Sequence, residues 1–215
     1  MFDLSSKTKV NRKFRLAELY KMMGADKDIK ADAKNIVSVI LTNVLSQDTM
    51  NLSSDGKVKE VYIFDIELNT KTLPTLFISS LDKAINLHTV FILKCDDEQM
   101  LYGCYKEKTE KGVKLGKYYG TDWTKEKTPI SLPLNVNNID DIYTAIIDEL
   151  IPITANQGEE TSDFVARFDR INKLKNEIVR LQKQVDNERQ PKKRFELNDE
   201  LKKLKKEIER LEAGG

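Results

Sequence analysis

Asp65 and Glu67 are the residues whose types and spacing come closest to a chemical site. They stand two apart in an alternating segment, so their carboxylates are expected on one face of a β-strand. Such a pair can hold Mg²⁺ for phosphodiester hydrolysis, because hard cations prefer oxygen ligands. Nucleases of the restriction type usually add a lysine two residues after an acidic ligand, but Asn69 stands there and the next lysine is Lys71. The preferred interpretation is the exposed polar end of a strand, with a magnesium-binding pair as the alternative.

The sequence offers little for the other common catalytic chemistries. It holds one histidine, His88, so neither a histidine metal cluster nor a two-histidine mechanism can be built. No G-x-S-x-G nucleophile motif accompanies His88, which is expected to be structural at the start of a strand. Walker-type and G-x-G-x-x-G loops are missing, so no nucleotide site is expected. No cofactor is predicted, apart from Mg²⁺ under the carboxylate alternative.

The two cysteines, Cys95 and Cys104, are too few for a disulfide framework. They also lack the C-x-x-C spacing of redox and zinc sites. Both fall on expected strands, where a thiol behaves as a small buried apolar group. The sequence therefore predicts two buried free thiols.

Two groups of basic residues are candidates for contact with nucleic-acid phosphates. The first lies in a predicted helix near the start of the chain and contains Arg12, Lys13 and Arg15. The second lies in the tail and contains Lys192, Lys193 and Arg194. Acidic residues elsewhere balance both groups, and the formal net charge is +1. Solvated helix faces are therefore the preferred interpretation, and any DNA contact is expected to be indirect.

Length and composition indicate one globular domain with an appendage. The chain has 215 residues, of which 33% are charged and 40% hydrophobic, enough for a core. Charged and polar residues follow Met1-Phe2-Asp3-Leu4, so no signal peptide is expected. No apolar run approaches the ~20 residues of a membrane span. We expect a cytoplasmic protein that does not contact a membrane.

The first 152 residues predict an α+β domain whose mixed sheet has about five strands flanked by helices. Its centre is a β-hairpin over 88–106, in which residues 90–93 are all apolar and are expected to be covered on both faces. A strand over 58–68, a helix opening at Pro74 and a strand over 114–123 surround this hairpin. Apolar residues at helical spacing predict a further helix over 139–151.

The amino-terminal segments are harder to assign. A helix is expected from Ser5 or Ser6 to about Met23, ended by Gly24 in a left-handed conformation. A second helix is expected over 26–35. Residues 36–45 fit both periods, and we favour a helix that changes to a strand near Ser38.

The tail predicts a different architecture. After a linker over 153–163, two heptad seams follow, and the second is displaced by two residues from the register of the first. One straight coiled coil does not explain this shift, whereas an antiparallel coiled-coil αα-hairpin over 164–215, turning between Asn187 and Pro191, does. Its seam is expected to dock against the globular domain, a second copy or a protein partner. The candidate partner-binding residues are Phe164, Phe168, Ile171, Leu174, Leu201, Leu204 and Ile208.

Five stretches of the chain resemble the bacterial and archaeal domain of unknown function 4391 family. They are SVILTNVLSQDTMNL, KEVYIFDIEL, LDKAINLHTVFIL, GTDW and ERQPKKRFELNDELKKL, between Ser38 and Leu204. The segment QPKKRFELN departs from the more usual N-R-K-V-E-L-N-like form, so the resemblance does not extend to a role for that turn.

The resemblance implies no catalytic residues. Genes of this family often lie beside restriction-modification, helicase or methyltransferase genes, which implies an accessory role in defence against foreign DNA. The leading hypothesis is therefore a non-enzymatic interaction subunit that docks a helicase, a methyltransferase or itself through the hairpin. The alternative is a metal-dependent nuclease or nuclease-like DNA-binding protein that uses Asp65 and Glu67.

Overall fold

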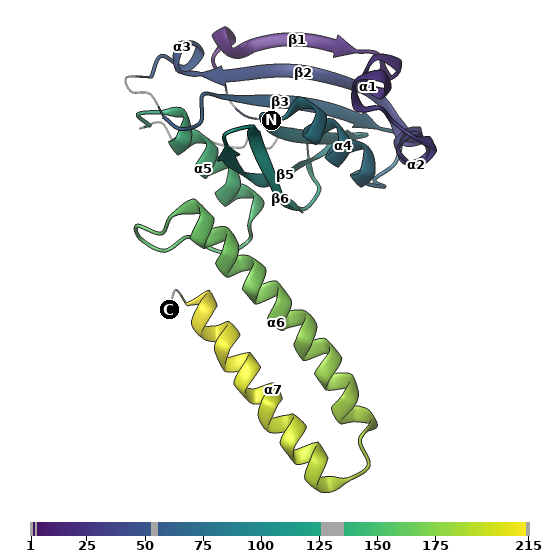
Figure 1. Cartoon of the computed structure of the whole chain (residues 1–215), viewed down its shortest axis with the longest axis vertical. Coiled ribbons are helices and arrows are strands. Elements are labelled where there is room, and N and C mark those ends of the chain that lie inside the picture. Colours follow the sequence, from purple (N-terminus) through teal and green to yellow (C-terminus); the bar gives the residue numbers. More distant parts are fainter. Residues whose placement is uncertain (1, 3, 53–55, 126–135, 214–215) are drawn as a thin grey trace. The chain divides into compact units, whose positions relative to one another are not determined.

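One mixed sheet organises the amino-terminal part of the computed structural model (Figure 1). The structure describes residues 2, 4–52, 56–125 and 136–213. They divide into two compact units, Met1–Leu150 and Ile151–Gly215. The first unit contains the sheet and the second contains two consecutive helices. The predicted α+β class is confirmed.

The sheet has seven strands, two more than expected. Their spatial order along the main path is β1 (Lys9–Phe14), β2 (Ile36–Ser46), β3 (Glu60–Leu68), β4 (His88–Cys95), β5 (Glu98–Thr109) and β6 (Gly112–Gly120). A short strand, β7 (Thr124–Lys125), pairs with β5 off this path. All neighbours are antiparallel except β3 and β4, which are parallel. The predicted hairpin over 88–106 is confirmed as β4 and β5.

Helix α4 (Thr75–Ile85) makes the crossover that a parallel pair requires, between β3 and β4. Pro74 is its N-cap, one position before the predicted place. The helix buries Phe77, Ile78 and Leu81. Helical spacing also predicts Leu76 and Leu87 on the apolar side, but both are exposed. The face turned to the sheet is centred on positions 77, 78 and 81, and Leu87 lies beyond the end of the helix.

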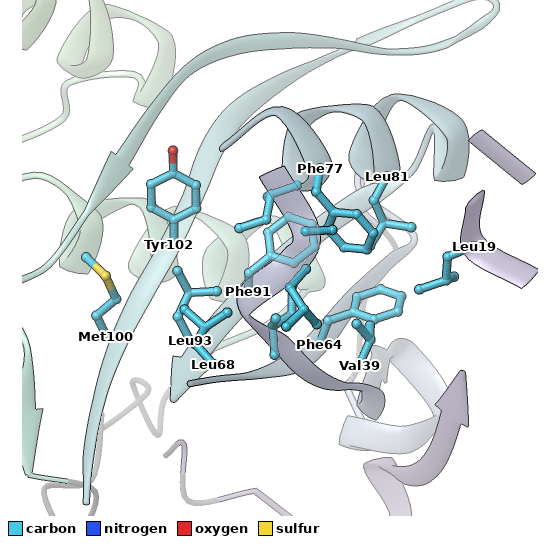
Figure 2. Close-up of a cluster of buried hydrophobic side chains, with 14 of the residues drawn as sticks. Leu19, Val39, Phe64, Leu68, Phe77, Leu81, Phe91, Leu93, Met100 and Tyr102 are labelled. Carbon is cyan, nitrogen blue, oxygen red and sulfur yellow. The ribbon is translucent and has the colours of Figure 1, made fainter. Parts of the chain in front are cut away.

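One core cluster lies between α4 and one face of the sheet (Figure 2). Phe77 and Leu81 of the helix point towards Phe64 and Phe91 of the two parallel strands, whose rings stack with centroids 5.9 Å apart. Leu19 of α1 (Leu16–Met23) joins the same cluster. Burial of these side chains holds β3 and β4 in register, at about 25 cal/mol for each Å² of apolar surface removed from water.

The helix predicted over 139–151 is present as α5 (Ile139–Leu150), and it packs on the opposite face of the sheet. The Tyr143 ring meets the His88 ring edge-on, with centroids 4.8 Å apart. A Cβ on Gly103 would lie 3.3 Å from Leu150, so this glycine permits close approach of helix and sheet. The sheet is therefore packed on both faces around its parallel pair.

The prediction of one helix up to Met23 is wrong for its first half. A 3₁₀ turn, η1 (Ser6–Thr8), leads into β1, and only α1 is helical. Pairing with β2 overrides the local helical pattern, and a register shift between Lys9 and Arg12 accompanies a positive φ of 52° at Asn11. Gly24 ends α1 in the left-handed conformation, as predicted.

The next segments follow the sequence more closely. Asp26 caps α2 (Lys27–Asp32), which is continued by η2 (Ala33–Asn35). Strand β2 begins at Ile36, so the helix expected at the start of 36–45 is wrong. A short helix, α3 (Gln47–Met50), follows it. The tract Ser53-Ser54-Asp55-Gly56 predicts a turn, and Pro129 and Pro133 predict a loop. Residues 53–55 and both prolines lie outside the described residues.

The predicted αα-hairpin is confirmed in the second unit. Helix α6 (Thr161–Asn187) and helix α7 (Pro191–Glu212) are joined by a three-residue connection. The out-of-phase seams predict Leu181 near Leu197 or Leu201, and Leu174 near Leu204 or Ile208. In the structure Leu181 shares a cluster with Leu201, and Leu174 shares one with Ile208. Two small apolar clusters thus follow the length of the hairpin.

Candidate functional site

Asp65 and Glu67 lie at the carboxyl-terminal end of β3, on the sheet face that α5 packs against. The structure adds a lysine that motif spacing within one strand did not supply. Lys94 stands opposite Glu67 on the parallel strand β4, and its Nζ lies 2.8 Å from Asp65 Oδ2. Two carboxylates and one ammonium therefore meet at the end of the parallel pair.

Hydroxyl groups of β2 complete this cluster. Ser38 Oγ donates a hydrogen bond to Glu67 Oε2 at 3.1 Å. Thr42 Oγ1 lies 3.4 Å from Asp65 Oδ1 and makes a shorter bond of 3.1 Å to the Ile63 carbonyl. The contact of Asp65 Oδ1 with Thr42 is long for a hydrogen bond, while Asp65 Oδ2 pairs with Lys94.

The cluster is partly open to solvent. The side chains of Asp65 and Lys94 are 11% and 20% exposed, and Glu67 is exposed. Half-buried Ile40 is the β2 neighbour of Asp65. A small ion or a phosphate group can thus reach the carboxylates, whereas a group enclosed in the core cannot be reached.

The donor set suits magnesium better than other metals. Within the described ranges, no group of three or more His, Cys, Asp or Glu side chains is arranged to hold a metal ion. Mg²⁺ is commonly bound through one or two carboxylates, with waters and substrate phosphates as the remaining ligands. Asp65 Oδ1 and the exposed Glu67 carboxylate fit that pattern, provided the ion shares Asp65 with Lys94.

The candidate nucleic-acid residues are divided between the two units. Arg12 and Lys13 lie on the edge strand β1, and Arg15 is the N-cap of α1. Their expected helix is therefore replaced by a strand, which separates neighbouring side chains onto opposite faces.

The basic group of the tail lies at the start of α7. Lys192, Lys193 and Arg194 are exposed in its first turn, which contains no acidic residue. A helix dipole disfavours positive charge at this end, by about 0.3–1 kcal/mol for each residue. Helix stability therefore does not explain this placement.

The candidate partner-binding residues are mostly buried. All have less than a tenth of their surface exposed except Leu204, which is half-buried. Ile171, Leu174 and Ile208 pack with one another inside the hairpin, so its seam is already filled. The outward-facing apolar residues of the hairpin are Val179 and Phe195, 58% and 65% exposed, which the heptad analysis did not select.

A buried polar cluster was missed by the sequence analysis. Lys106 Nζ lies 3.0 Å from Asp82 Oδ2, and neither side chain is exposed. Lys106 also donates to the Thr89 carbonyl at 2.6 Å, and Tyr118 donates to Asp82 Oδ2 at 2.6 Å. The sequence contained a signal for Asp82. It stands four residues after the apolar Ile78, which places it on the same, buried face of the predicted helix.

His88 is buried in the sheet unit, where its ring meets that of Tyr143. Burial, followed by the positive charge of Lys106, lowers the pKa of His88 to about 4. Cys95 and Cys104 are free and buried, as predicted. Burial raises the pKa of Cys104 to about 11, so it is not a reactive thiolate.

Comparison with known proteins gives one positive result. A family model described as a domain of unknown function, DUF4391, matches residues 2–208. No curated protein and no solved structure matches the chain. Among the described residues, no helix is both long enough and apolar enough to span a membrane. Since the family model covers nearly the whole sequence, the chain belongs to the DUF4391 family.

Proposed function

We propose that the sheet unit contains a magnesium-dependent, nuclease-like site, formed by Asp65, Glu67 and Lys94, that acts on phosphodiester groups of nucleic acid. The observation that supports this proposal is the position of Lys94, in register with Glu67 and 2.8 Å from Asp65. Sequence spacing within β3 supplies no lysine, and the neighbouring strand provides one. Two oxygen ligands and an ammonium within one partly exposed cluster are the groups that phosphodiester hydrolysis uses.

Each side chain has a distinct role in this proposal. Asp65 Oδ1 and Glu67 would hold the cation, and Ser38 orients the Glu67 carboxylate through its hydrogen bond. Mg²⁺, when bound, supplies charge neutralisation and a more acidic water. Lys94 stabilises negative charge that develops on the phosphoryl oxygens. In the hydrolysis, a water oxygen bonds to phosphorus, the bond to the leaving ester oxygen breaks, and that oxygen takes up a proton.

The test is cleavage of plasmid, linear duplex and single-stranded DNA in MgCl₂ or MnCl₂, with EDTA as the blank. We expect Asp65→Asn and Lys94→Met each to lower the cleavage rate at least about 100-fold, the size of the loss when one stabilising group is removed. Glu110→Gln, which removes an exposed carboxylate from the turn between β5 and β6, is the matched control. Absence of metal-dependent cleavage by the wild-type chain contradicts the proposal.

A second candidate function is that of an interaction subunit whose hairpin docks a protein partner. What supports it is the exposure of Phe195, which lies next to the three basic residues in the first turn of α7. Apolar and basic side chains together fit an acidic, partly apolar partner surface. The gene neighbours of the family suggest a helicase or a methyltransferase, and a defence system as the setting.

Co-purification from native cells tests this second function. We expect the full-length chain to recover a partner that a chain truncated after Gln157 does not recover. Phe195→Ser should lower the recovery, whereas Lys203→Ser, an exposed change on the same helix, should not. Equal recovery by the truncated chain rules out docking through the hairpin.

A further inference from the structure

The register of the sheet connects the basic edge strand to the carboxylate site. Lys13 of β1 pairs with Ile40 of β2, and Ile40 pairs with Asp65 of β3. Residues directly opposite each other in antiparallel strands point to the same face. Lys13 therefore lies on the same face as Asp65, two strands away.

A second row across the sheet repeats this arrangement. Lys9 pairs with Asn43, which pairs with Ile63, and Ile63 shares the face of Asp65 because it lies two residues before it on β3. The register shift between Lys9 and Arg12 keeps both lysines of β1 on this face. Both lysines are exposed at the open edge of the sheet.

Arg12 lies on the opposite face. It pairs with Leu41, a residue of the core cluster beneath α4, and its guanidinium lies 4.8 Å from the centroid of the Phe14 ring. Arg12 thus has a structural role in covering an aromatic ring. Of the two neighbouring cations on β1, Arg12 therefore lies on the face that packs beneath α4, and Lys13 lies on the face that contains Asp65 and Glu67.

The spacing suits a chain of phosphates. Adjacent strands lie about 4.8 Å apart, so two strand spacings place Lys13 about 10 Å from Asp65. Along the axis of a duplex, where each nucleotide of one strand rises about 3.4 Å, this distance corresponds to roughly three nucleotides, and to fewer along an extended single strand. Ile40, which lies between the two, is half-buried.

We infer that Lys9 and Lys13 bind the phosphates of a nucleic-acid strand a few nucleotides from the group held at Asp65 and Glu67. This inference rests on the proposed function for the identity of the site and adds the direction in which the strand runs, across β3, β2 and β1. The two lysines are positioning residues. The charge complementarity between exposed ammonium groups and a polyanion is what selects this occupant.

The experiment is a binding titration of labelled single-stranded DNA and of RNA of the same sequence, at several salt concentrations in EDTA. Lys13→Gln is expected to weaken binding about 3- to 10-fold and to lower the slope of log affinity against log salt by about 0.7. Arg12→Gln, the matched control, removes one charge from the other face and should change the affinity less than about 2-fold. Equal losses for the two variants, or no binding of either nucleic acid by the wild type, overturn the inference.

Cleavage assays separate this inference from the proposed function. Lys13→Gln should raise KM and leave kcat unchanged, because it removes contacts made equally in the ground and transition states. If no variant cleaves DNA but the difference between Lys13 and Arg12 remains in EDTA, the phosphate-binding face stands and the nuclease proposal fails. If cleavage is observed and that difference is absent, only the inference fails.

Discussion

The sheet unit contains two Lys–Asp pairs with the same chemistry and opposite surroundings. Lys106 and Asp82 are 3.0 Å apart and fully buried, with Thr89 and Tyr118 bonded to them. Lys94 and Asp65 are 2.8 Å apart at the end of the parallel strands, and both are partly exposed. The first pair is enclosed among protein partners, whereas the second can exchange a partner for an ion or a phosphate.

This difference indicates that the Lys106–Asp82 pair serves stability, whereas the Lys94–Asp65 pair is available for binding a ligand. A buried charge is tolerated only when paired and hydrogen-bonded, so removing one member of the enclosed pair leaves a charge in a medium that cannot solvate it. The Lys94–Asp65 pair, whose side chains are 20% and 11% exposed, is expected to contribute less to stability than the enclosed pair, because water and salt still reach and screen it. Removing it should leave the fold intact and abolish binding of ligands.

The largest effect is expected for Lys106→Met, which leaves Asp82 buried without its counter-charge. The sheet unit should lose about 3–5 kcal/mol of unfolding free energy. Urea unfolding followed by the fluorescence of Trp123, the single tryptophan, measures this loss. A double variant with Asp82→Leu should recover most of it, and a loss below about 1 kcal/mol for the single variant would show that water reaches the pair.

A smaller effect is expected for Tyr118→Phe. This change removes the hydroxyl that donates to Asp82 Oδ2 at 2.6 Å. Burial raises the pKa of Tyr118, so it remains a donor at all ordinary pH values. The same unfolding measurement should give a loss of about 1.5–3 kcal/mol, as for a hydrogen bond to a buried charged group. Tyr20→Phe, in α1, is the control, since its hydroxyl makes no bond to either pair.

The pH dependence of the unfolding free energy should come from the buried side chain of His88. The pKa of His88 is about 4 in the folded chain and about 6.5 when unfolded, so the unfolded state binds the extra proton between these values. Stability is then full above pH 6.5 and falls as the pH drops towards 4. Allowing for solvent screening, we expect a loss of about 1–2 kcal/mol.

The variant His88→Gln checks this expectation. Thermal unfolding between pH 4 and 7 should show a weaker pH dependence for His88→Gln than for the wild type. Lys94→Met should leave the dependence unchanged, because Lys94 is not among the charges that shift the pKa of His88. An unchanged profile for His88→Gln would assign the dependence to carboxylates.

The smallest effect on stability is expected for Lys94→Met. Loss of a partly exposed ion pair should cost less than about 1 kcal/mol. The same variant should lose the activity or the DNA binding of the carboxylate site. A loss of several kcal/mol would make this pair structural and remove the contrast between the two.

Several elements could be predicted from the sequence because their signals are local. Four consecutive apolar residues identified β4, and apolar spacing identified α5. The two-residue phase shift of the heptad seams and Pro191 identified the hairpin turn. The first half of the expected amino-terminal helix failed because pairing of β1 with β2 depends on residues about 30 positions away.

The same distinction applies to the candidate site. The sequence determined that Asp65 and Glu67 share a face, since the alternation of a strand is a property of its own backbone. Tertiary structure alone decided that Lys94 meets them and that Lys13 shares their face, because both depend on the register between strands. Tertiary structure also decided that Lys106 is buried with Asp82. A charged residue of a strand is buried only where a counter-charge from another element pairs with it.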